Sequence, residues 1–176
     1  MLEAREVTDI PIIPPAEATL HYACLLGDKI GVVSMQERVA CIMWEKVLNN
    51  YGFRDRAIIN PVRGVNLSTY EAVTKGMADN NIIVKAVEET AKELVQDGAE
   101  VIIIGCGLYA PICTINGLVK LEGDVPILDP MAISFKLAEV MLDLKNSIGL
   151  PVLSRVGMYP RMPEKDVKRI REHVAC

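Results

Sequence analysis

Four short runs of aliphatic residues alternate along the chain with longer stretches in which apolar residues recur at helical spacing. The clearest run, Val101–Ile104, is followed by Gly105, and an apolar run with a glycine behind it is typical of a strand buried on both faces. Residues 29–33, 57–62 and 125–128 form the other runs. Because strands that alternate with helices form βαβ units, the pattern predicts an α/β fold with a parallel sheet flanked by helices.

Capping and breaking residues place the helices between these runs. Ser34 and Glu37 have the S-x-x-E spacing of a capping box, and Asp129 followed by Pro130 is typical of a helix start. Residues 63–80 are polar and predict a long loop, and loops of that length often carry function. We expect helices over residues 15–26, 34–50, 83–97, 111–122, 130–146 and 164–174, and a tail rich in Pro and Gly over 147–163.

Cys106 lies between Gly105 and Gly107, directly after the strand at 101–104. Ligands of parallel α/β folds bind outside the carboxyl ends of the strands, and flanking glycines let a ligand approach the backbone closely. The start of the following helix supplies free N–H groups and a positive partial charge, which favours a thiolate. We therefore interpret Cys106 as a reactive thiol that acts on an anionic or carbonyl-bearing small molecule. A buried structural cysteine is the alternative.

Other polar residues follow the predicted strands. Ser34 and Asp129 each end a strand, and Asn60 is a further candidate for the same edge of the sheet. A ligand oxygen placed at this edge would meet several backbone N–H groups. Ser34 and Asp129 are also ordinary N-cap residues, so capping alone accounts for their type. Pro61 predicts that its strand ends there or lies at the edge of the sheet.

A dinucleotide site is a competing interpretation of the same turn. Residues 105–110 fit the pattern G-x-G-x-x-A between a strand and a helix, and Asp129 ends the next strand, where such folds place a ribose-binding acid. The fingerprint usually opens its domain, however, whereas this one follows two strand–helix units. The central cysteine is also not required for dinucleotide binding.

Composition narrows the class of protein. The chain is 51% hydrophobic and 5% aromatic, with a formal net charge of −4, and no basic patch indicates nucleic-acid binding. No apolar run approaches the length of a membrane span, and the charged start is unlike a signal peptide. A disulfide framework or a metal site is not expected, because no C-x-x-C pair occurs; a reducing cytoplasm fits best. We expect Cys24 and Cys41 to pack in the core and Cys113 to be buried, with a second reactive thiol as the alternative for Cys113.

Several stretches, in their order and spacing over most of the chain, match one family. These stretches are Ala4–Glu6, Ile10–Ala18, Leu25–Ser34, Tyr51–Phe53, Ile103–Leu108, Val125–Asp129 and Ser154–Pro160. On them, residues 1–160 resemble the aspartate/glutamate/hydantoin racemase superfamily and are most similar to its hydantoin racemase branch. The resemblance implies a flavodoxin-like, racemase-like lobe.

The resemblance also implies a chemistry. Family members use no cofactor; two cysteines on opposite faces of a planar intermediate remove and return the proton on the carbon α to a carbonyl. Cys106 matches the second of these cysteines, and a thiolate can serve as such a base. Ser34 matches a hydroxyl that binds substrate in relatives. The remaining residues expected to bind substrate are Gly105, Gly107, Leu108 and Asp129.

The family's first cysteine has no counterpart here. We therefore expect residues 1–26 to be the end of a truncated N-terminal lobe with a connecting helix, 27–130 to be the α/β lobe that carries Cys106, and 131–176 to be a return helix and tail. Either the chain is a fragment or it has lost two-base racemisation. The related arylmalonate decarboxylases use only the second cysteine.

The resemblance therefore implies a cofactor-independent racemase or epimerase, with Cys106 as acid/base and a hydantoin or an amino acid as substrate. Loops such as 63–80 would set its specificity. A nucleotide-binding or non-catalytic domain is the alternative. We expect a small-molecule substrate, neither nucleic-acid nor membrane partners, and a homo-oligomer, because faces that would contact a missing lobe leave apolar surface exposed.

Overall fold

The computed structural model describes residues 4–174 and divides the chain into two compact units. One unit is Pro15–Ser134, which holds the whole sheet. The other combines the segments Met1–Pro14 and Phe135–Cys176. All the residues that we singled out as candidates for the site belong to the first unit.

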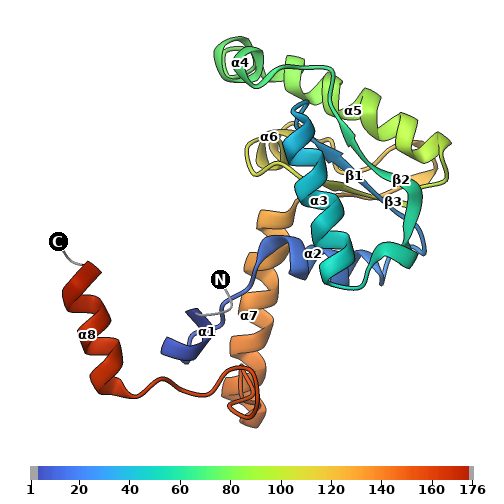
Figure 1. Cartoon of the computed structure of the whole chain (residues 1–176). Coiled ribbons are helices and arrows are strands. Elements are labelled where there is room, and N and C mark those ends of the chain that lie inside the picture. The colour runs from blue at the N-terminus through green and yellow to red at the C-terminus, as the bar shows by residue number, and fades with distance from the viewer. Residues whose placement is uncertain (1–3, 175–176) are drawn as a thin grey trace. The chain divides into compact units, whose positions relative to one another are not determined.

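The first unit is built on a parallel sheet, seen in Figure 1 between helices. The sheet has four strands in the order β2-β1-β3-β4. Its strands are β1 (Ile30–Ser34), β2 (Ala57–Gly64), β3 (Val101–Ile104) and β4 (Ile127–Leu128). Every residue of β1, β3 and β4 is buried, as expected for strands that are covered on both faces. The predicted parallel α/β fold is confirmed.

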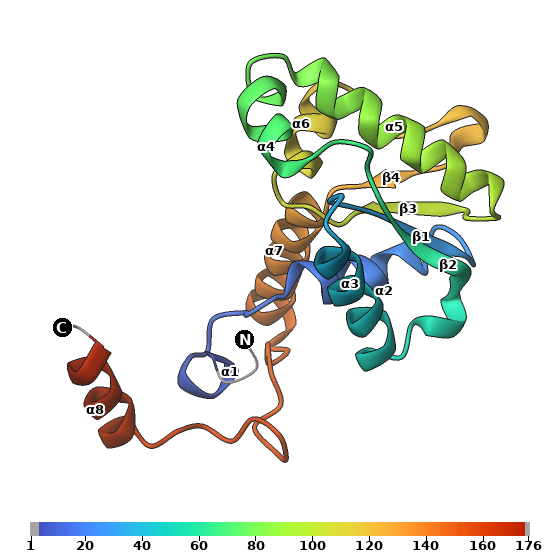
Figure 2. The same cartoon turned by 45° about the horizontal axis from the view of Figure 1, so that its top comes forward.

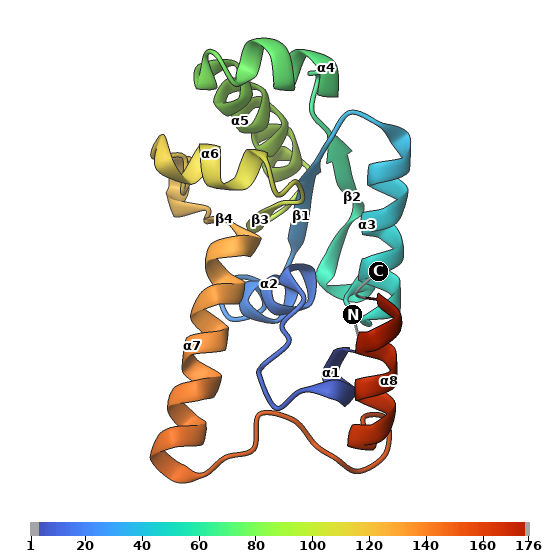
Figure 3. The same cartoon turned by 90° about the vertical axis from the view of Figure 1, so that its left-hand side faces the viewer.

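Helices cover both faces of this sheet (Figure 2). Helices α5 (Asn80–Gln96) and α6 (Tyr109–Ile115) lie on one face, and α2 (Pro15–Ala23) and α3 (Arg38–Asn50) lie on the other, as the view in Figure 3 also shows. Each face has its own aliphatic core, because side chains alternate across the strands. Ile102 and Ile104 pack with α5 and α6, whereas Val101 and Ile103 pack with α2 and α3.

Strand β2 is an edge strand, as Pro61 predicts. Ile30 pairs with Ala57 but Val32 pairs with Val62, so the register shifts around the proline. The expectation that Asn60 lies at the end of its strand is wrong. Strand β2 continues to Gly64, which leaves Asn60 exposed in mid-strand.

The capping box predicted for Ser34 and Glu37 is also wrong. Ser34 is the last residue of β1, where it pairs with Gly64 and its carbonyl oxygen accepts a hydrogen bond from the Val65 N–H at 3.0 Å. Helix α3 starts later, with Glu37 in the cap position and no side-chain hydrogen bond to the cap. Strand pairing therefore decides the conformation of Ser34 in place of helix capping.

Two further expectations need correction. Helix α6 ends at Ile115, well before residue 122, because Gly117 has a φ of +82° and ends the helix. Residues 63–80 are partly helical: Ser68 caps α4 (Thr69–Glu71), and a π-helical turn, η2 (Ala72–Gly76), follows. Three side chains of this segment are buried, which ties it to the core: Val65, Leu67 and Ala72.

Helix α7 (Pro130–Ile148) begins as predicted, since the Asp129 carboxylate accepts hydrogen bonds from the Met131 and Ala132 N–H groups at 2.8 and 3.3 Å. The residues of α7 from Phe135 onward belong to the second unit. Large apolar side chains on this part of α7 stay exposed: Phe135, Val140, Leu142, Leu144 and Ile148.

The first unit also has two short 3-10 turns, η1 (Arg54–Arg56) and η3 (Glu122–Asp124). The second unit also contains α1 (Ala4–Val7) and α8 (Glu164–Val174). Arg155 links the two segments of the second unit: the guanidinium donates to the carbonyl oxygens of Arg5 and Thr8 and forms an ion pair with Asp9 at 2.6 Å. Among the described residues, no helix is long and apolar enough to cross a membrane.

Candidate active site

Three of the candidate residues lie at the carboxyl ends of neighbouring strands. Ser34 ends β1, Cys106 follows β3, and Asp129 follows β4. The strand order β1-β3-β4 brings these ends side by side at one edge of the sheet, where parallel α/β folds bind their ligands. Asn60 lies in the middle of β2 and is not part of this group.

Cys106 occupies a tight turn that the backbone holds in place. The Gly105 N–H donates to the Val33 carbonyl oxygen at 2.6 Å, and the Cys106 carbonyl oxygen accepts from the Ala110 N–H at 3.0 Å. The side chain is buried, at 8% exposure. A Cβ added at Gly107 would meet no atom within 4 Å, so the space beside Cys106 is open on this side.

Backbone N–H groups next to Cys106 are available to a ligand. Helix α6 starts at Tyr109 without a side-chain cap. Within the part of the chain that the structure describes, the N–H groups of Gly107 and Leu108 donate to no protein acceptor. These two donors follow Cys106 directly, so they can meet an oxygen of a molecule bound at the thiol.

The Ser34 hydroxyl lacks the partner that a buried polar group normally has. The residue is 1% exposed, and its Oγ is hidden from solvent without a hydrogen bond. Buried hydroxyl groups in folded proteins are nearly always paired, so an unpaired one at the end of a central strand points to a ligand or water. This is a property that the capping interpretation of Ser34 does not account for.

Between residues 4 and 174, two further side-chain oxygens are hidden without a hydrogen-bond partner: Glu37 Oε2 and the phenolic oxygen of Tyr109. Burial is the main cause that raises the pKa of Tyr109 to about 12, with smaller electrostatic contributions from Cys106 and Glu37. Both residues therefore act electrostatically on Tyr109, which follows Cys106 by three positions. Sequence reasoning missed Glu37 and Tyr109 as candidates, although the S-x-x-E spacing did draw attention to Glu37.

The other Glu37 carboxylate oxygen, Oε1, is held by the segment after β2. It accepts a hydrogen bond from the Thr69 N–H, at the start of α4, at 3.2 Å. Hydrogen bonding from Thr69 holds the pKa of Glu37 below its usual value, which keeps the carboxylate ionised at neutral pH. The segment 63–80 thus contributes to the site by orienting an acidic side chain.

Cys113 and Asp129 both make contacts within the fold. Burial raises the pKa of the fully buried Cys113 thiol to about 12, with smaller effects of Asp129 and Cys106, so this thiol stays protonated. Asp129 caps α7 through Oδ1, and its Oδ2 accepts a hydrogen bond from Thr114 Oγ1 at 3.3 Å. Cys24 and Cys41 are half-buried, the former against the α2–α3 core.

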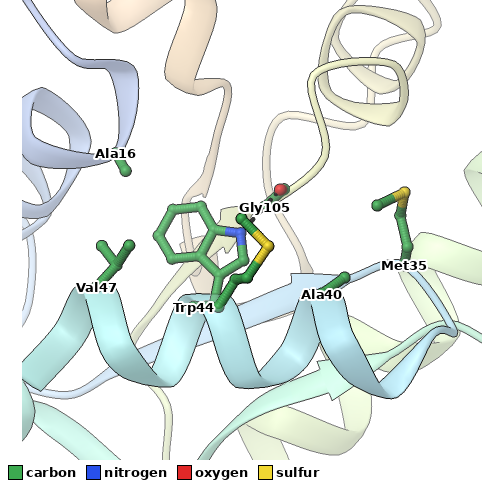
Figure 4. Close-up of a pocket in the computed structure, with 7 residues that line it drawn as sticks. Ala16, Met35, Ala40, Trp44, Val47 and Gly105 are labelled. Carbon is green, nitrogen blue, oxygen red and sulfur yellow. Dashed lines mark hydrogen bonds between the residues drawn. The ribbon is translucent and has the colours of Figure 1, made fainter. Parts of the chain in front are cut away.

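An apolar cavity of about 250 Å³ adjoins the glycine turn on the α3 side (Figure 4). Trp44 lines it, and the indole Nε1 donates to the Gly105 carbonyl oxygen at 2.8 Å. The wall residues Met35 and Gly105 adjoin Ser34 and Cys106 in sequence. The other residues that line it are Ala16, Ala40, Met43 and Val47.

The described side chains offer no metal centre. No group of three or more His, Cys, Asp or Glu residues between residues 4 and 174 is arranged to hold a metal ion. The chemically distinctive features of this edge of the sheet are therefore a thiol, hydroxyl groups, a carboxylate and free backbone N–H groups.

Comparisons with known proteins agree on one family. The model of the Asp/Glu/Hydantoin racemase family matches residues 1–138. Hydantoin racemases from Pseudomonas sp. (strain NS671) and Paenarthrobacter aurescens are both 28% identical to this chain, and each alignment covers 92% of it. The alignments cover 59% and 62% of those two proteins.

Two solved structures of allantoin racemases share the fold. An allantoin racemase from Klebsiella pneumoniae matches with a TM-score of 0.67 at 26% identity, over 92% of this chain and 61% of that one. An allantoin racemase from Pseudomonas fluorescens matches with a TM-score of 0.67 at 25% identity, over 90% of this chain and 61% of that one. The chain thus spans less than two thirds of the length of each relative.

Proposed function

Since this chain belongs to the Asp/Glu/hydantoin racemase family, we propose that it is a racemase or epimerase that moves a proton at the carbon α to a carbonyl group. Its substrate is a small carbonyl compound such as a hydantoin or an amino acid, and no cofactor takes part. One observation carries the proposal: a buried thiol, Cys106, sits beside a strand whose last residue, Ser34, has an unpaired hydroxyl.

Each group has a role in this reaction. The Cys106 thiolate takes the α proton, the C–H electron pair moves into a double bond to the carbonyl carbon, and the carbonyl oxygen takes the negative charge. Hydrogen bonds from Ser34 Oγ and from the N–H groups of Gly107 and Leu108 stabilise that oxygen. Gly105 and Asp129 shape the site, the former at the turn and the latter at the start of α7.

The stereochemical outcome depends on how the proton returns. A proton returned by Cys106 on the same face gives exchange with solvent and no inversion. Inversion needs a second acid on the opposite face, and Cys113 is unsuited to that role because its side chain is fully buried. The family resemblance assigns this other acid to the family's first cysteine, which has no counterpart in this sequence.

The substituent on the acidic carbon has a natural place. The cavity around Trp44 is apolar and starts at Gly105, directly before the proposed base. A volume of about 250 Å³ accommodates an aliphatic or aromatic group. We therefore propose that this cavity holds the side chain of the substrate while its carbonyl group faces Ser34.

The test is incorporation of deuterium from D₂O at the α carbon of hydantoins and amino acids. We expect exchange with the wild-type chain, loss of exchange in Cys106→Ser, and normal exchange in the matched control Cys41→Ser. Chiral chromatography of the products then distinguishes one-base exchange from inversion. A folded wild-type chain without exchange above buffer contradicts the proposal. Binding of NAD⁺ that survives in Cys106→Ala would favour the dinucleotide-binding alternative instead.

A further inference from the structure

The proposed reaction leaves two polar groups that follow strands of the sheet unused, Glu37 after β1 and Tyr109 after β3. Glu37 Oε2 and the Tyr109 hydroxyl are both hidden from solvent without a hydrogen-bond partner. Unpaired buried polar groups are rare in folded proteins and need an explanation such as a bound ligand. Glu37 follows β1 and Tyr109 begins α6, so the two approach the carboxyl edge of the sheet from different elements.

The hydrogen-bonding character of these groups is fixed. Glu37 is ionised and can only accept; its Oε1 is occupied by the Thr69 N–H, so the free Oε2 requires a donor. Tyr109 keeps its proton, since its pKa is about 12, and can donate like Ser34. A ligand that satisfies all three offers an N–H donor to Glu37 and acceptor oxygens, such as carbonyl groups, to Tyr109 and Ser34.

We infer that Glu37 is a substrate-binding residue whose Oε2 accepts a hydrogen bond from an N–H group of the substrate and thereby selects ureides and amides over free carboxylates. The inference rests on the proposed function, because it takes the edge around Cys106 as the substrate site. A carboxylate at this position would face the Glu37 charge, whereas a neutral ring N–H gains a charge-assisted hydrogen bond.

Binding of substrate analogues that have no α hydrogen separates this inference from the proton transfer. The probe is 5,5-dimethylhydantoin, which keeps the ring N–H and carbonyl groups but cannot exchange. Its two N-methylated derivatives each lack one N–H donor, and 2-aminoisobutyrate supplies a carboxylate. Dissociation constants are measured by calorimetry or NMR titration on the full wild-type chain.

The informative variant is Glu37→Gln. The Thr69 N–H retains the amide oxygen, so the NH₂ group takes the place of Oε2 and an acceptor becomes a donor. We expect wild type to bind the parent ureide about tenfold more tightly than one N-methylated derivative, the scale of one charge-assisted hydrogen bond. Glu37→Gln should abolish this preference, and Glu45→Gln, an exposed control on α3, should keep it.

The outcomes separate cleanly. A preference for the N–H form that persists in Glu37→Gln overturns the inference, as does wild type that binds no ureide saturably or binds 2-aminoisobutyrate more tightly. A merely structural role of Glu37 would lower the affinity for all probes equally. Ureide binding that depends on Glu37, without deuterium exchange, means that the proposed function fails while the binding role stands. Deuterium exchange with the same KM in wild type and in Glu37→Gln means that the proposed function stands while the binding role of Glu37 fails.

Discussion

The indole Nε1 of Trp44 and the carbonyl oxygen of Gly105 are joined by a hydrogen bond of 2.8 Å. The indole also leaves no space for a side chain at Gly105, because an added Cβ would overlap Nε1. Helix α3 therefore holds the turn before Cys106 by a polar contact and by close packing at once. Gly107, on the other side of Cys106, has no such neighbour within 4 Å.

The first prediction concerns this asymmetry. Gly105→Ala should lower the free energy of unfolding by ~1–3 kcal/mol, the usual cost of overpacking, whereas Gly107→Ala should change it by ~0.5 kcal/mol or less. Urea denaturation measures both. Replacing Trp44 with Leu in the Gly105→Ala background should recover part of the loss, since it removes the clash. Equal losses for the two alanine variants would contradict the asymmetry.

A second prediction follows from Cys113 and Tyr109, whose pKa values burial raises to about 12. The folded state holds these protons more tightly than the unfolded state, where a thiol titrates near ~8.5 and a phenol near ~10. Their stabilising contribution is complete below those values and is lost as the pH rises toward 12. Stability should fall by up to ~1.4 kcal/mol per pH unit for each group.

Cys113→Ala isolates the thiol contribution. The free energy of unfolding, measured by denaturant titration from pH 8 to 10, should decline less steeply in this variant than in wild type. Cys41→Ala, at a half-buried position on α3, should decline as wild type does. Identical slopes for Cys113→Ala and wild type would show that the thiol does not titrate with unfolding.

The third prediction tests the cavity beside Gly105. In the variant Ala40→Leu, the larger side chain would occupy part of the space that we assign to the substrate side chain. The ratio of kcat/KM in the exchange assay for 5-methylhydantoin over 5-benzylhydantoin should rise by about tenfold or more, as expected when a pocket loses room for several carbon atoms. Val39→Leu, at an exposed neighbouring position, should leave the ratio unchanged.

The sheet and its site edge follow from local pattern, whereas the polar contacts do not. Consecutive apolar residues in Val101–Ile104 and the following glycine identify β3, because a strand with helices over both faces of its sheet needs apolar side chains on both faces. Asp129 as a helix cap is equally local, since its partners lie two and three residues away. Such features depend on neighbours in sequence alone.

Long-range pairing decides what the pattern missed. Ser34 remains in β1 because Gly64, thirty residues later, extends the ladder beside it. Glu37 is oriented by the Thr69 N–H, from a segment that appeared to be a polar loop. Nothing in the local sequence of Glu37 or Tyr109 shows that their oxygens are hidden without partners, because that depends on contacts with residues distant in sequence.

The fourth prediction concerns α7. Phe135 and Ile148 are 66% and 71% exposed, and three more large apolar side chains of the same helix segment are exposed too. Apolar surface of this kind favours association, so the chain should self-associate at micromolar to millimolar concentration and bind a hydrophobic dye. The double change Phe135→Lys and Ile148→Lys should reduce both effects, and Asn146→Lys should not.

Analytical ultracentrifugation over a range of concentrations gives the readout. A wild-type chain that sediments as a monomer throughout, without dye binding, would contradict this prediction. Association that is unaffected by the two lysines would assign it to another surface.

The proline in β2 limits how copies of this chain can join. An exposed strand edge recruits strands from other molecules and so leads to aggregation, but Pro61 offers no N–H and the register shift beside it distorts that edge. The opposite edge is β4, which is only two residues long. Both edges of the described sheet are thus poor templates for intermolecular strand addition, which favours helices as the surfaces through which copies of this chain associate.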